Sequence, residues 1–138
     1  MQATLDNGKE VIFREYEEED FPQINKLNEL EGWNTLVERA EETREALENS
    51  NITYVALIDE KIVGYVRGMT DKQITLFICE VIIDKELRGS GIGKKILQYV
   101  HAKYPKTRME LLGSSTSKSF YEKLKFRPFY GFRKTIQE

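Results

Sequence analysis

The spacing of apolar residues changes along the chain, and each change predicts a different element. Residues 9–16 alternate between apolar and polar side chains, which predicts a first strand. Residues 17–30 carry apolar side chains at helical spacing, with Asp20 placed to cap a helix and Pro22 in its first turn. A second helix is predicted after a break at residues 31–34, because Thr35 and Glu38 have the spacing of a capping box.

From residue 52 the pattern becomes that of strands. Residues 52–59 and 61–69 predict an antiparallel hairpin with a tight turn near residues 59–61. Residues 73–84 predict a strand that is buried on both faces, with positions 78, 80 and 82 on the same face. The remaining elements are a helix over 91–104 that Pro105 ends, a strand over 107–113, a serine-capped helix over 114–125 and an extended segment over 126–136.

The predicted order of elements is β-α-α-β-β-β-α-β-α-β. The hairpin is antiparallel, whereas the connection from strand 73–84 through helix 91–104 to strand 107–113 allows a right-handed parallel crossover. The fold class predicted is therefore α/β, or more closely an α+β arrangement with a mixed sheet covered by helices. Since the sequence contains no repeat, low-complexity tract or linker, we predict one domain over residues 1–138.

Composition narrows the classes of function. The chain has 21 Lys and Arg against 23 Asp and Glu, so it lacks the basic excess typical of proteins that bind nucleic acid or membrane surfaces. Residues 1–10 lack the apolar core of a signal peptide, and no stretch has the length of a membrane helix. The single cysteine, Cys79, lies in an apolar run that is typical of an inert buried thiol, so we expect a cytoplasmic protein. With one histidine, His101, and no paired cysteines, we expect no metal site.

A cluster of glycines lies where the buried strand meets the next helix. Gly89, Gly91 and Gly93 are flanked by basic residues, and the first amides of a helix lack partners, so this junction favours a phosphate or pyrophosphate. A plain strand-to-helix turn would need only one glycine. A P-loop would require glycine at 88 and Ser or Thr at 95, and a dinucleotide fingerprint would require glycine at 94, so neither motif fits.

What remains is RGSGIG, in the form R-x-x-G-x-G, and here the chain resembles the GNAT superfamily of N-acetyltransferases. The resemblance extends to the element order, to CEVIID ahead of the loop, to RGSGIGKKIL at the start of the helix and to SFYEKLKF about 30 residues later. It implies a GNAT-like acyl-CoA N-acyltransferase fold. It also implies an enzyme that uses acetyl-CoA as cosubstrate and transfers the acetyl group directly to a primary amine.

The resemblance also assigns the residues that would hold CoA. The loop backbone would bind the pyrophosphate through the amides of Gly89, Ser90, Gly91, Ile92, Gly93 and Lys94, with Arg88 opening the motif. The strand before the loop would be splayed from its neighbour by a bulge. Free backbone groups at Val81, Ile82 and Ile83 would pair with the pantetheine arm, and one amide would polarise the thioester carbonyl.

Two side chains are candidates for the chemistry. Glu80 is a carboxylate in an apolar strand, and it is interpreted either as a general base for an ammonium substrate or as an ion-pair partner of Arg67 on a neighbouring strand. In the resembled family some members use a chain of waters as the base instead. Tyr121 has the spacing of a core residue, but the resemblance to the FYEKLGF pattern makes it the acid that protonates the thiolate of CoA.

The chain departs from the family pattern at two positions. Ser114 stands where an asparagine usually contacts the pantetheine arm, and Ser114 or Ser115 would take over part of that contact. Lys125 replaces a glycine and is expected to adopt the left-handed conformation or to shift the turn.

The acceptor is the least determined part. The resemblance implies that the acceptor binds near Glu31, Trp33, Asn34 and the segment 126–136, whose aromatic residues are Phe129, Tyr130 and Phe132. Trp33 is interpreted either as a residue that covers the core or as a platform for an aromatic or cationic acceptor. We predict a small-molecule or peptide amine, with no nucleic acid or membrane as partner. The alternative function is a non-catalytic CoA-binding or sensing module. An exposed C-terminal strand would allow a homodimer, although the sequence does not set the oligomeric state.

Overall fold

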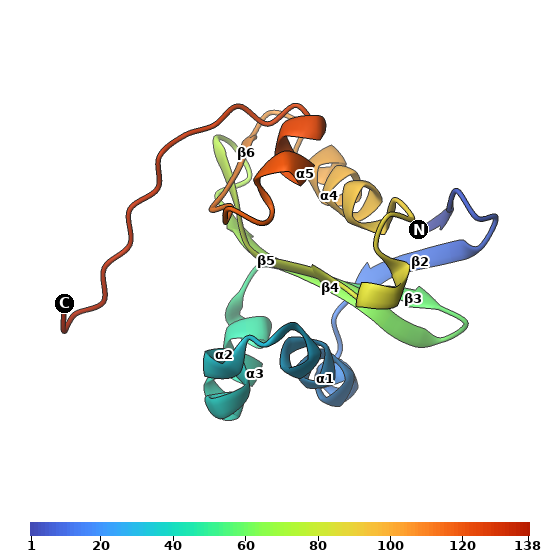
Figure 1. Ribbon diagram of the computed structural model, residues 1–138, viewed down its shortest axis with the longest axis horizontal. Coiled ribbons are helices and arrows are strands. Elements are labelled where there is room, and N and C mark those ends of the chain that lie inside the picture. The colour runs from blue at the N-terminus through green and yellow to red at the C-terminus, as the bar shows by residue number, and fades with distance from the viewer.

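The computed structural model describes residues 1–138 and has a curled six-stranded sheet at its centre (Figure 1). The sheet contains, in spatial order, β1 (Gln2–Thr4), β2 (Glu10–Glu15), β3 (Ile52–Ile58), β4 (Lys61–Thr70), β5 (Thr75–Ile83) and β6 (Arg108–Leu111). The α-helices are α1 (Phe21–Glu31), α2 (Asn34–Glu38), α3 (Ala40–Asn49), α4 (Ile92–Lys103) and α5 (Lys118–Lys123). Helices α1 to α3 cover one face of the sheet, and α4 and α5 cover the other. None of these helices is long and apolar enough to cross a bilayer.

The predicted pairing of the strands is confirmed. Strands β3 and β4 form the antiparallel hairpin, and its turn residues Asp59 and Glu60 both have positive φ, at 49° and 65°. Strands β5 and β6 are parallel and connected by α4, as expected for a βαβ crossover. Strand β1, which pairs with β2, was not predicted, because its three residues are too few to show a period.

The helices before the sheet differ from the sequence prediction in two details. The carboxylate of Asp20 does not cap α1; it accepts two hydrogen bonds from Arg14 (2.7 and 2.9 Å) and one from the amide of Glu17 (2.8 Å). Burial pushes the pKa of Asp20 upward, but these hydrogen bonds outweigh it and leave the pKa lowered. The predicted capping box at Thr35 and Glu38 is also wrong, because Thr35 lies inside α2 and the chain breaks at Arg39 before α3 begins.

A β-bulge in β5 changes which face each of its side chains meets. Arg67 of β4 pairs with Glu80, but the next residue, Gly68, pairs with Ile78, so Cys79 is an extra residue in the strand. Ile78 belongs to the core beneath α4, whereas Ile82 belongs to the core beneath α1. The prediction that positions 78, 80 and 82 share one face is therefore wrong, because the bulge reverses the alternation between 78 and 80.

The C-terminal segment does not join the sheet. Residues 126–136, predicted as a final extended element, contain no strand, and the chain leaves the body beyond α5 as an extended tail (Figure 1). Strand β6 therefore has no neighbour on its outer side. The observed order of elements otherwise agrees with the predicted mixed fold.

Candidate functional site

The sheet separates between β5 and β6, and this separation forms the first part of the site. The parallel pairing begins at Thr75 with Arg108 and ends at Ile78 with Leu111. Strand β5 then continues to Ile83 with a partner on its β4 side only. The bulge at Cys79 lies directly where the pairing with β6 ends. Five residues, 79–83, thus have no strand partner on the side that faced β6.

The register identifies which backbone groups of β5 are free. The amide of Asp84 donates to the carbonyl of Val63 (2.8 Å), so this pair is hydrogen-bonded across the ladder. Hydrogen-bonded pairs alternate in an antiparallel ladder, which makes Ile82 with Tyr65 the next such pair. The backbone groups of Val81 and Ile83 therefore point away from β4. Of the three positions predicted to bind pantetheine, Ile82 is directed to β4, and only Val81 and Ile83 lie on the free edge.

The second part of the site is the glycine loop at the start of α4. The amides of five residues donate to no acceptor within the chain: Gly89, Gly91, Ile92, Gly93 and Lys94. The amide of Ser90, which was predicted to bind the same anion, instead donates to the carbonyl of Leu87 (3.3 Å). Because α4 also directs the positive end of its dipole here, the five free amides form a site suited to a diphosphate.

The glycines of this loop have different reasons to be glycine. Gly89 and Gly91 have φ values of 84° and 94°, a region that residues with a Cβ atom rarely adopt. Gly93 instead permits close packing of α5, because a Cβ atom there would lie 3.1 Å from the ring of Phe120. Gly89 and Gly91 are therefore the positions at which a side chain would strain the loop itself.

Arg88 connects this loop to the opposite face of the sheet. Its guanidinium donates to both carboxylate oxygens of Glu31 in α1 and, through Nε, to the carbonyl of Ile83 (3.3 Å). The second contact agrees with the carbonyl of Ile83 facing the free edge. A cleft of about 240 Å³ lies beside this pair, between α1 and the end of β5, with Leu27, Leu30 and Ile82 among its lining residues.

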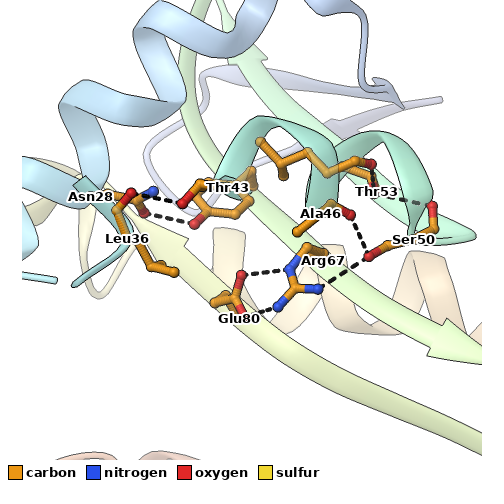
Figure 2. A network of polar contacts seen from close by, with 10 residues as sticks. Asn28, Leu36, Thr43, Ala46, Ser50, Thr53, Arg67 and Glu80 are labelled. Carbon is orange, nitrogen blue, oxygen red and sulfur yellow. Dashed lines mark hydrogen bonds and ion pairs between the residues drawn. The ribbon is translucent and has the colours of Figure 1, made fainter. Parts of the chain in front are cut away.

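Glu80 forms the ion pair with Arg67 that was one of its two interpretations. Arg67 donates to both oxygens of Glu80 (2.7 and 2.5 Å) and to the hydroxyl of Ser50 (3.1 Å), as Figure 2 shows. The hydroxyl of Ser50 in turn donates to the carbonyl of Ala46 in α3. The hydrogen bonds that Arg67 donates to Glu80 raise the pKa of Arg67, which burial alone would lower. Through Ser50, the ion pair thus connects the bulged strand β5 to α3. The role of Glu80 as a base stays a prediction.

Removal of one partner of this pair should destabilise the protein. The side chains of Arg67 and Glu80 are only 16% and 15% exposed, so Arg67→Met leaves a largely buried carboxylate without a partner. We expect the free energy of unfolding to fall by about 3 kcal/mol, measured by urea denaturation. The double variant Arg67→Met/Glu80→Leu should recover most of this loss. An equal loss in the single and double variants would contradict the prediction.

Tyr121 lies on the other side of the sheet from Glu80. It packs against the core beneath α4, and its ring makes edge contacts with Phe120 and Phe126 at centroid distances of 5.1 and 5.5 Å. Burial raises the pKa of its phenol above the ordinary value of 10.0, so the hydroxyl keeps its proton at neutral pH. Glu80 and Tyr121 therefore approach the separated strands from opposite faces, with the free edge of β5 between those faces.

The two departures from the family pattern have defined local structures. The hydroxyl of Ser114 lies 2.8 Å from that of Thr116 and 3.2 Å from that of Ser117, so it belongs to a polar cluster before α5. Lys125 adopts a φ of 71°, as expected. The amide of Phe126 donates to the carbonyl of Tyr121 and that of Lys125 to the carbonyl of Glu122, which is the pattern of a Schellman motif.

Lys125→Gly should stabilise the protein. The same motif ends α1, where glycine at position 32 has a φ of 81°. A lysine at this position costs about 1 kcal/mol relative to glycine, so the free energy of unfolding should rise by roughly that amount. Lys125→Ala is the control, because alanine removes the side chain but keeps the strained conformation. A gain of equal size in the alanine variant would contradict this explanation.

The sequence did not predict the contact of Arg88 with Glu31, nor where the residues of the expected acceptor region lie. Nothing in the spacing indicated that Glu31 would bind Arg88, because 57 positions separate them. Trp33 packs against the core beneath α1, in agreement with its interpretation as a core-covering residue. The aromatic residues predicted to join it, Phe129, Tyr130 and Phe132, are 82%, 95% and 93% exposed on the tail. The predicted acceptor region is therefore not assembled within this chain.

Comparison with known proteins agrees with this geometry. The GNAT acetyltransferase domain model matches residues 49–128, more than half of the chain. No curated protein matches. A GNAT family acetyltransferase of Streptococcus pneumoniae superposes with a TM-score of 0.76 at 20% identity, covering 93% of this chain and 98% of that one. An acetyltransferase of Trypanosoma brucei gives 0.64 at 24% identity, covering 91% and 98%.

A third similar structure carries a more specific description. It is an aminoglycoside acetyltransferase from an uncultured soil metagenomic sample, in complex with sisomicin, with a TM-score of 0.66 at 18% identity and coverage of 91% and 96%. At these levels of identity the structures establish the fold alone. The domain match and the shared fold together show that the chain belongs to the GNAT family of acetyltransferases.

Proposed function

We propose that this protein is an N-acetyltransferase that moves the acetyl group of acetyl-CoA directly to a primary amine. One observation carries the proposal: five free amides at the start of α4 adjoin the unpaired edge of β5. The amides suit the diphosphate. The backbone groups of Val81 and the amide of Ile83, whose carbonyl accepts from Arg88, suit the polar groups of the pantetheine arm. A strand edge beside an anion site therefore fits a ligand that carries both a diphosphate and an amide-containing arm.

In the proposed reaction the free edge of β5 orients the thioester. The amide of Val81 or Ile83 donates to the thioester carbonyl and stabilises the negative charge that develops when the amine attacks. Tyr121 donates its proton to the departing thiolate. Because a thioester is already activated, holding the two reactants together supplies a large share of the rate.

The acceptor amine must lose a proton before it attacks, and Glu80 is the group proposed to receive it. Arg67 occupies one lone pair on each oxygen of Glu80, which leaves a further acceptor site on each oxygen. The proton passes to Glu80 directly or through water. The ion pair gives Glu80 a second task in either case, because it holds the carboxylate in one orientation.

The acceptor is proposed to enter from the α1 side through the cleft beside Glu31. Four apolar side chains and three carboxylates line it beside Lys85 and Arg88, and Arg88 pairs with one of those carboxylates, Glu31. The remaining carboxylates, Asp84 and Glu86, and the apolar lining favour an amine with an apolar portion. The proposal includes a cytoplasmic location, where acetyl-CoA would be available.

The experiment is a measurement of free thiol released from acetyl-CoA in the presence of a panel of primary amines. Amine-dependent release by the full-length protein supports the proposal. Glu80→Gln should reduce release most at neutral pH, where the acceptor is an ammonium that must lose a proton, and least above the pKa of the acceptor amine. The second candidate is a CoA-binding module without catalysis. Calorimetric binding of CoA with no thiol release for any amine would support that module and reject the transferase.

A further inference from the structure

The turn between β1 and β2 brings a carboxylate to the start of α4. A Cβ atom added at Gly91 would lie 3.7 Å from Oδ2 of Asp6. Since a Cβ atom is one carbon–carbon bond away from its Cα atom, the carboxylate lies at most about 5 Å from Cα of Gly91. Figure 1 shows the N-terminal strands next to the loop that begins α4. A negative charge therefore lies beside the five free amides.

The structure holds this carboxylate in place through the residue before it. Leu5 is 3% exposed and belongs to the core beneath α4, together with Ile92, the first residue of that helix. The amide of Leu5 also donates to the carbonyl of Lys9 across the turn (2.7 Å). Asp6 therefore follows an anchored residue, and the core sets its position relative to the loop.

Neither the turn nor a counter-ion accounts for the acid at this position. The amide of Lys9 donates to the side chain of Asn7 (3.0 Å), whereas the carboxylate of Asp6 accepts no hydrogen bond from the turn. Cε of Lys95 lies 3.9 Å from the same Cβ position, but Asp6 is in none of the ion pairs of the chain. The negative charge of Asp6 therefore has no ion-pair partner beside the loop.

A carboxylate at this position has opposite effects in the free protein and in the protein with CoA bound. In the free protein it lies near the positive end of the α4 dipole, which is favourable. A bound diphosphate brings further negative charge to the same end of the helix, and the carboxylate then repels it. Because acetyl-CoA and CoA carry the same diphosphate, this repulsion weakens the binding of both by the same factor.

We propose that Asp6 sets the affinity for acetyl-CoA and CoA, and that it lowers this affinity by charge repulsion at the diphosphate. The inference rests on the proposed use of acetyl-CoA. It gives the turn between β1 and β2 a part in the reaction, because a weaker hold on the diphosphate lets the product CoA leave sooner after each transfer. The chemical step is unaffected, since the thioester is at the other end of the pantetheine arm.

Calorimetry with CoA on Asp6→Asn, in buffer that contains EDTA, tests the repulsion. The dissociation constant should fall ~5-fold, since the substitution keeps the shape of the side chain and removes its charge. The gain should shrink between ~0.01 M and ~1 M salt, over which the Debye length falls from ~30 Å to ~3 Å. An increase in affinity cannot result from a variant that fails to fold. Glu45→Gln, in α3 on the opposite face of the sheet, is the matched control and should leave the affinity unchanged.

A second ligand shows which phosphate the carboxylate faces. Dephospho-CoA keeps the diphosphate and lacks the phosphate on the ribose, so the affinity of Asp6→Asn for it should rise by the same factor. A gain with CoA alone, an unchanged or higher dissociation constant in Asp6→Asn, or an equal gain in Glu45→Gln would overturn the inference and leave the proposed function standing. If neither the wild-type protein nor Asp6→Asn binds CoA, the proposed function fails, and the inference fails with it.

Discussion

Tyr121→Phe should lower kcat for acetyl transfer by about 10³-fold, since it removes the proton donor for the CoA thiolate. The dissociation constant of CoA should change little, because the ring contacts of Tyr121 with Phe120 and Phe126 do not involve the hydroxyl. Thiol release measured at saturating acetyl-CoA gives kcat, and calorimetry with CoA gives the dissociation constant. A variant that loses affinity rather than kcat would contradict a role as proton donor.

The pH dependence and a matched variant test the same assignment. Burial raises the pKa of Tyr121, so the phenol is protonated and active below that pKa, and activity should fall only at a pH above the ordinary value of 10.0. In Tyr121→Phe this alkaline decline should disappear. Tyr104→Phe, at the end of α4, removes a phenol that lies outside the site and should keep full activity. Equal losses in the two variants would show that the effect is structural.

Gly91→Val should weaken CoA binding by ~100-fold, because valine strongly disfavours the φ of 94° that the loop requires. The β-branched side chain also projects from the residue that precedes α4, where the amides of Ile92 and Gly93 are free. Calorimetric titration with CoA measures the change. The loop would have to change shape to relieve the strain, and the five amides would no longer point to one place.

A second glycine provides the control for strain alone. Gly8, in the turn between β1 and β2, has a φ of 83°, and a Cβ atom added there would have no other atom within 4 Å. Gly8→Val should therefore lower the free energy of unfolding without changing the affinity for CoA. Undiminished affinity in Gly91→Val would remove the basis of the diphosphate site. An equal loss of CoA affinity in Gly8→Val and Gly91→Val would show that general destabilisation causes the loss.

The sequence was sufficient for most of the fold because its elements have clear periods. The hairpin, the crossover through α4 and the glycine loop follow from local patterns, and the structure confirms each of them. The break at Arg39 between α2 and α3 could not be predicted, since the residues around it continue a helical pattern. Residues 126–136 were predicted as a last extended element, but they form no strand, and the outer edge of β6 stays unpaired.

The site was predictable in its backbone part and less so in its side chains. Glycine at positions 89 and 91 signals both the positive φ values and the free amides. The pairing of Glu80 with Arg67 was one of two interpretations, and only the register could select it. The contact of Arg88 with Glu31 depends on how α1 lies across the end of β5, which no local pattern contains.

The extra residue at Cys79 exchanges the faces of the even and odd positions within β5. Leu76 and Ile78, before it, are anchored in the α4 layer. After it, Ile82 is anchored in the α1 layer, and Val81 and Ile83 take over the contact with the α4 layer. Because a continuous backbone joins these anchors, a displacement of α1 against the sheet pulls on the α4 layer along the chain itself. The face proposed to receive the amine and the face proposed to deliver the acetyl group are thus joined by a few consecutive peptide units of β5.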